Sequence, residues 1–172
     1  QQANPAKRLS VPLHRTALGL YYNSTWAEEL GFASSPQTPQ EFERQACAAA
    51  LQNGDGTGGW LITPETSTLV GWMYSFGGSI VKPDSKGYQI DTNENYQALM
   101  FLKNLQTKGC GWTTTQLYPH AEFAERKALF VIGSTTGITG QNMAFQSVES
   151  DDEWTVIPFP AQIDTSTPGH LP

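Results

Sequence analysis

Short apolar runs of strand-forming residues alternate along this chain with segments that carry helix start and stop signals. This alternation is typical of α/β proteins, in which helices cover a central sheet. We expect strands at 17–23, 58–63, 128–132 and 153–161. We expect helices at 24–32, 38–54, 64–78, 91–109, 119–127 and 136–146, with a surface turn or short hairpin at 82–90. The predicted fold class is therefore α/β, with a central sheet flanked by helices.

The helix at 38–54 has the clearest end signals. Thr38 is expected to cap its N-terminus, Pro39 suits the first turn, and Glu41 completes a capping box. Gly54 is expected to end this helix, because glycine readily adopts the left-handed conformation found at helix C-termini. These signals fix both ends of one helix from local sequence alone.

Two other helices also have candidate caps. Asp91 is expected to cap the helix at 91–109, and Ser24 or Thr25 the helix at 24–32. Side chains of these types accept hydrogen bonds from the free N–H groups of a first helical turn.

The length and charge of the chain bound its class. A chain of 172 residues suits one domain, which we place at 11–161 between polar tails at 1–10 and 162–172. Ten basic and 16 acidic side chains give a net charge of −6, which argues against nucleic acid and against an anionic membrane surface. We expect a monomer.

Two glycine-rich motifs and three histidines do not form known sites. The sequence GDGTGG at 54–59 fits G-x-G-x-x-G, but a helix is expected before it and a strand after it, the reverse of a dinucleotide site. The sequence GSTTGITG at 133–140 lacks the lysine of a phosphate loop. His14, His120 and His170 are scattered. We therefore expect no catalytic residues, no metal and no cofactor.

The two cysteines, Cys47 and Cys110, belong to no metal-binding motif. They are either two buried free thiols or one disulfide. The sequence pattern by itself favours neither state.

Small polar residues follow two of the expected strands. Glu65 comes shortly after the strand at 58–63, and Ser134 and Thr136 come after the strand at 128–132. In α/β sheets the carboxyl ends of strands open onto a shared crevice, where hydroxyls and free N–H groups can bind a polyhydroxylated or anionic ligand. Ordinary helix capping by Ser134 or Thr136 is the alternative interpretation.

Five segments of the chain resemble, in order, the extracellular solute-binding proteins (family 1) of ABC importers, the type that binds sugars or glycerol 3-phosphate. They are VPLHRTALGLYYNSTWAEELGF at 11–32, PQTPQEFERQACAAA at 36–50, WMYSFGG at 72–78, EFAERKALFVIGSTTGI at 122–138 and WTVIPFP at 154–160. One departure is Arg126, which stands where the family usually has glycine. The resemblance covers 11–161 and corresponds to the second lobe alone, without the opening units and return segments of the first lobe.

The resemblance implies a periplasmic-binding-protein-like lobe that binds a sugar without catalysis and works with ABC permease subunits. It implies a bacterial, extracytoplasmic location, in the periplasm or anchored at the cell surface. In such a compartment disulfides persist, and we expect Cys47 and Cys110 to be bonded to each other. One lobe of a two-lobed clamp should bind its solute weakly.

The family's ligand contacts map onto three places in this sequence. The implied ligand-binding residues are Arg15, Thr16, Glu65, Thr66, Ser67, Ser134, Thr135 and Thr136. Trp60, Trp72 and Trp112 could stack on a sugar, although packing in the core is the simpler role. The same two roles are open to Tyr118.

Several alternatives stay open. A phosphorylated polyol such as glycerol 3-phosphate would be favoured by Arg15, whereas Glu65 favours a neutral ligand rich in hydroxyls. Glu65 could also be an acid that stabilises a helix N-terminus. A glycoside hydrolase or transferase would need a second carboxylate, and a pure interaction module would need an exposed apolar patch.

Overall fold

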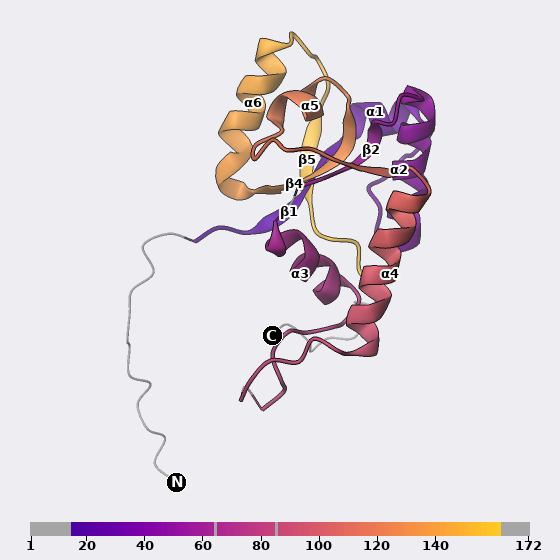
Figure 1. Ribbon diagram of the computed structural model, residues 1–172. Helices are drawn as coiled ribbons and strands as arrows, with labels where there is room; N and C mark the ends of the chain where they lie inside the picture. Colours follow the sequence, from indigo (N-terminus) through magenta and orange to yellow (C-terminus); the bar gives the residue numbers. More distant parts are fainter. Residues whose placement is uncertain (1–14, 64, 85, 163–172) are drawn as a thin grey trace.

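The computed structural model describes residues 15–63, 65–84 and 86–162 of the chain (Figure 1). The predicted tail at 1–10, all but the first residue of the predicted tail at 162–172, and Pro64 at the start of one predicted helix lie outside these residues. The strands are β1 (Leu18–Asn23), β2 (Gly58–Ile62), β3 (Gly111–Thr113), β4 (Ala128–Ser134) and β5 (Trp154–Ile157). The helices are α1 (Ser24–Glu29), α2 (Pro39–Asn53), α3 (Thr66–Ser75), α4 (Asn93–Thr107), α5 (His120–Ala124), the 3₁₀ turn η1 (Thr135–Gly137) and α6 (Ile138–Ser147). The α/β class is confirmed.

The five strands form one mixed sheet in the order β3-β2-β4-β1-β5. β2 pairs in parallel with β3 and β4, whereas β1 pairs antiparallel with β4 and β5. The carboxyl ends of β2 and β4 therefore lie at the same edge of the sheet as the amino end of β1.

Alternating side chains send each strand's apolar groups to both faces of the sheet. Tyr22 and Trp60 belong to a core cluster shared with α2 and α4, and their neighbours Tyr21 and Leu61 to a second cluster shared with α5 and α6. In Figure 1 α5 and α6 lie on one side of the sheet, and α2 and α4 lie on the other. Because both faces are covered, the strands read in the sequence as continuous apolar runs.

The helix N-cap predicted from the sequence is correct for one helix and wrong for two. The capping box of Thr38 and Glu41 is present at α2. The cap of α4 is Thr92, whose side chain accepts from the backbone of Asn95, and not Asp91. The cap of α1 is Asn23, one residue before Ser24 and two before Thr25, the two expected caps. Asn23 is the last residue of β1, so its side chain is already placed to meet the N–H of Trp26, at 2.9 Å.

Other element bounds were wrong in ways that the chemistry explains. β5 ends at Ile157, well before position 161, because Pro158 and Pro160 carry no N–H for strand pairing. β3 was not predicted, since its three residues are too short to show a pattern. The helix at 136–146 is divided into η1 and α6.

The glycine-rich segment at 54–59 is a turn from α2 into β2, as expected. Gly54, Gly56 and Gly58 have φ of 68°, 90° and 107°, which side chains disfavour. This order of elements does not form a dinucleotide site, whose phosphates need a helix after the turn.

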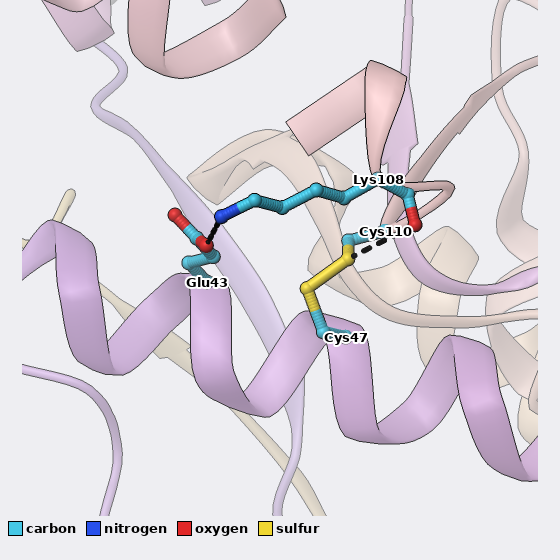
Figure 2. Close-up of a disulfide and its surroundings, with 4 residues drawn as sticks. All are labelled: Glu43, Cys47, Lys108 and Cys110. Carbon is cyan, nitrogen blue, oxygen red and sulfur yellow. Dashed lines mark hydrogen bonds and ion pairs between the residues drawn. A yellow bond between two sulfur atoms is a disulfide. The ribbon is translucent and has the colours of Figure 1, made fainter. Parts of the chain in front are cut away.

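Cys47 on α2 and Cys110 before β3 form a disulfide, with Cα atoms 4.4 Å apart. The prediction of this bond is confirmed. Figure 2 shows Lys108 and Glu43 forming an ion pair beside it. The two contacts join α2 to the chain that leaves α4.

None of the helices in the described part of the chain has both the length and the apolar character needed to cross a membrane.

Candidate ligand-binding cavity

The sheet topology brings three separate segments to one end of the sheet, where β2 and β4 finish and β1 starts. Leu18, at the start of β1, pairs with Ser134, at the end of β4. β2 lies parallel to β4 on its other side, so Thr63 and Glu65 leave the sheet at this edge too. The predicted crevice at the strand ends therefore has a structural counterpart.

A cavity of about 310 Å³ opens at this edge. Its lining comes from the ends of β1, β2 and β4, from the turn into α6, and from 117–120 before and at the start of α5. Of the predicted site residues, Glu65, Ser134 and Thr136 line it. Such a hollow with a few convergent polar groups is the usual form of a small-molecule site.

Tyr21 supports the turn that bounds the cavity. Its hydroxyl donates to the backbone oxygen of Ser134 at 2.6 Å. A Cβ at Gly133 would collide with the Tyr21 ring, and one at Gly137 would lie 2.7 Å from its hydroxyl. The two glycines therefore let the turn pass closely over the tyrosine. Burial raises the pKa of Tyr21, so the hydroxyl stays protonated and keeps donating at neutral pH.

The hydroxyls of Ser134 and Thr136 are bonded to each other, with an oxygen–oxygen distance of 2.7 Å. Neither η1 nor α6 has a side-chain cap hydrogen bond. The capping interpretation of Ser134 and Thr136 is therefore wrong. A hydroxyl pair that does not cap a helix can turn toward a ligand in the cavity.

Glu65 occupies the N-cap position of α3 without capping it. One carboxylate oxygen of Glu65 instead accepts a hydrogen bond from the Ser67 hydroxyl at 3.1 Å. Ser67 thereby orients the carboxylate, although Ser67 does not line the same cavity.

The other predicted contacts lie around the edge and not in the cavity lining. Arg15, Thr16, Thr66 and Thr135 are exposed. The hydroxyls of Thr16 and Thr135 are 3.2 Å apart, which ties the chain before β1 to the turn after β4.

Ser67 lines a second hollow, of about 480 Å³, between α3 and the chain that follows β5. Val70, Tyr74 and Phe159 give it a largely apolar surface.

One wall of the cavity was not predicted, apart from Tyr118 as a possible stacking residue. Leu117, Tyr118, Pro119 and His120 line it, and the rings of Tyr118 and His120 stack at an angle of 17° with centroids 6.2 Å apart. The buried Gln141 of α6 bonds to His120 from behind. No local motif marks these residues, because the packing of α5 on α6 brings them together.

The tryptophans are not at the cavity. Trp60 and Trp72 are buried in the core beside Phe42. The ring nitrogen of Trp112 donates to the backbone of Lys127 at 2.8 Å. The expectation of core packing is confirmed for Trp60 and Trp72. Within the described residues, no group of three or more His, Cys, Asp or Glu side chains could hold a metal ion.

The sequence matches no protein-family model and no curated protein. The structure, however, is similar to solved binding proteins. The GacH receptor of Streptomyces glaucescens GLA.O, solved unliganded and with acarbose, aligns at a TM-score of 0.70 and 18% identity over 85% of this chain and 38% of the receptor. UgpB from Mycobacterium tuberculosis, in complex with glycerophosphocholine, aligns at 0.71 and 19% identity over 84% of this chain and 37% of UgpB.

A third similar structure is Lmo0181, an ABC substrate-binding protein from Listeria monocytogenes in complex with cycloalternan. It aligns at a TM-score of 0.65 and 19% identity over 82% of this chain and 36% of Lmo0181. Identities this low show the fold alone. The chain thus spans 36–38% of the length of these three proteins, and its fold is that of one periplasmic-binding-protein-like lobe.

Proposed function

We propose that this chain is the solute-binding lobe of an ABC importer's binding protein, and that its solute is a neutral sugar. The proposal involves no catalysis. One observation carries it: a lobe with this fold has a cavity where β2 and β4 end and β1 begins, and the polar groups of Glu65, Ser134 and Thr136 converge on it. This edge is where ligands bind in open α/β sheets.

The groups around the cavity suit a ligand with many hydroxyls. The Glu65 carboxylate accepts hydrogen bonds, and the Ser134 and Thr136 hydroxyls can both donate and accept. The Tyr118 side chain is 73% exposed beside them, so its ring is free to cover the apolar face of a sugar. Arg15, Thr16, Thr66 and Thr135 stay proposed contacts at the rim.

A phosphorylated polyol is the second candidate, because one of the similar structures holds glycerophosphocholine. The cavity supports it less well. Glu65 lines the cavity and would repel an anion, whereas Arg15 does not line it. We therefore propose a neutral sugar.

The proposed partners are the membrane subunits of an ABC permease, and the proposed location is outside the cytoplasm. The Cys47–Cys110 disulfide supports that location, because such bonds persist in oxidising compartments. In this proposal the first lobe of the two-lobed binding protein would close over the cavity, and closure would shift the population toward the form that the permease binds.

A glycoside hydrolase is disfavoured by the carboxylate count. Glycosidases place two carboxylates on either side of the bond that they cleave. Among the described residues that line the cavity, Glu65 is the one carboxylate.

The test is an amide NMR titration of the 172-residue chain with maltose, glucose and glycerol 3-phosphate at millimolar concentrations. We expect saturable shifts at Ser134–Gly137 with a sugar and weaker ones with the phosphate ester. Glu65→Gln should weaken sugar binding about three- to tenfold, since the amide oxygen of glutamine still accepts a hydrogen bond but without the negative charge that strengthens it. Glu94→Gln, an exposed acid in the first turn of α4, is the matched control.

Three outcomes would contradict the proposal. They are the absence of saturable shifts with any probe, shifts confined to the second hollow, and new anomeric signals that reveal cleavage of maltose. The last would favour the hydrolase.

A further inference from the structure

Gln141 fixes the tautomer of His120. Gln141 is fully buried and uses both ends of its amide on this one residue. Its Nε2 donates to the backbone oxygen of His120 at 2.9 Å, and its Oε1 lies 2.9 Å from the ring nitrogen Nδ1. A backbone oxygen can only accept, so the NH₂ group must face it and Oε1 must face Nδ1. Nδ1 must then carry a proton.

The neutral imidazole of His120 therefore has its lone pair at Nε2. Within the described part of the chain, Nε2 takes part in no hydrogen bond. Two glycines leave it uncovered: a Cβ at Gly140 would lie 3.2 Å from Nε2, and one at Gly137 would lie 3.7 Å from the adjacent Cε1. All three residues line the cavity.

We propose that His120 is a ligand-contacting residue whose Nε2 accepts a hydrogen bond from a solute hydroxyl, and that Gln141 is its positioning residue. The inference rests on the proposed binding function and narrows the ligand class. Nε2 and the Glu65 carboxylate are both acceptors, so the cavity selects a solute that presents several O–H donors. A fully ionised phosphate group has no proton to donate to either.

The first test uses nitrogen NMR of the His120 ring in the ligand-free chain, with His120→Asn identifying its signals among the three histidines. We expect a protonated Nδ1 and an unprotonated Nε2. Gln141→Met removes both hydrogen bonds of the side-chain amide and should let the His120 ring adopt the other tautomer. If the role of Gln141 were confined to packing, the ring signals would stay unchanged. A protonated Nε2 in the unmodified neutral ring would overturn the inference without any ligand.

The second test measures sugar affinity by the same titration with maltose and glucose. His120→Phe keeps a ring but loses the acceptor, and should bind about three- to tenfold more weakly. His120→Gln offers an amide oxygen in a similar place and should recover part of the loss.

Gly140→Ala places a methyl group against Nε2 and should also weaken binding. It should still fold, because alanine favours helices more than glycine does. Asn142→Ala, on the exposed side of the same helix, is the matched control.

The outcomes separate this inference from the proposed function. Sugar binding that is unchanged in His120→Phe and Gly140→Ala would overturn the role of His120 and leave the binding function standing. Absence of sugar binding by the unmodified chain would overturn both. Weakening in these two variants, partial recovery in His120→Gln and no effect of Asn142→Ala would support both.

Discussion

Arg126 combines an unfavourable backbone conformation with a favourable set of ion pairs. Its φ is 57°, in the left-handed region that suits glycine. Its guanidinium binds both carboxylate oxygens of Glu29 on α1 and both of Asp152 before β5, at 2.6–2.9 Å. The resembled family usually has glycine at this position, so here the side-chain contacts offset the strain that glycine would avoid.

This balance predicts different effects for two substitutions of Arg126. Arg126→Gly and Arg126→Ala both lose the ion pairs and should lower the free energy of unfolding by about 1–3 kcal/mol. Alanine also keeps the backbone strain, so it should be the less stable of the two by about 1 kcal/mol. Urea unfolding at pH 7 measures both. Equal stability of the two variants would show that the backbone at this position is not strained.

The pH dependence of the free energy of unfolding offers a second test of the same ion pairs. Hydrogen bonds from Arg126 lower the pKa of Asp152 below its ordinary value. A carboxylate whose pKa is lowered by folding stabilises the protein above its ordinary pKa of about 3.8 and loses this contribution as the pH falls through the lowered value. Arg126→Gly should therefore reduce the loss of stability below about pH 4, whereas Lys127→Gln, next to it in sequence, should not.

At the scale of elements, the sequence predicted well where local chemistry decides. The capping box and the C-terminal glycine of α2 act within a few residues, so they could be recognised without the fold. The caps of α1 and α4 were misplaced by one or two residues, because neighbouring Asn, Ser, Thr and Asp side chains can serve equally well until the backbone is fixed. β3 exists through its pairing with β2, which no local pattern could reveal.

The capping box at α2 yields a prediction of its own. Thr38→Ala removes the side chain that accepts from the N–H of Glu41, and should lower the free energy of unfolding by about 1 kcal/mol. Thr107→Ala, an exposed threonine at the end of α4, is the control and should be neutral or slightly stabilising, since alanine favours helices. Equal effects of the two changes in urea unfolding would contradict the capping role.

At the scale of the whole molecule, prediction of the site depended on where strands end. Ser134 ends β4, and Glu65 and Thr136 come shortly after the parallel strands β2 and β4, so the shared end of the sheet could be inferred from the alternation of elements. His120 and Gln141 are far apart in sequence and meet through the packing of α5 on α6. Their pairing was therefore beyond sequence reasoning, and His120 was set aside as an isolated histidine.

The disulfide closes a loop between positions 63 residues apart. It should contribute roughly 4 kcal/mol to stability, mainly by restricting the unfolded chain. Cys47→Ala combined with Cys110→Ala should lose about this amount in urea unfolding, and the reduced unmodified protein should lose a similar amount. The proposed sugar binding should be retained, because the bond lies where β3 begins and the cavity where β2 ends. Alkylation of both thiols without a reductant would contradict the bond.

The central position of β4 has a consequence for partial unfolding. β4 has two strands on each side of it, whereas the outermost strands β3 and β5 have only three and four residues. Fluctuations that detach an outermost strand leave β4 paired on both sides. The hydrogen-exchange rates of the β4 backbone amides should therefore be among the slowest in the molecule. The 3₁₀ turn η1, which carries Thr136, continues directly from Ser134 at the end of that strand. A molecule with frayed outer strands would therefore still hold Ser134 and Thr136 in place for the proposed ligand.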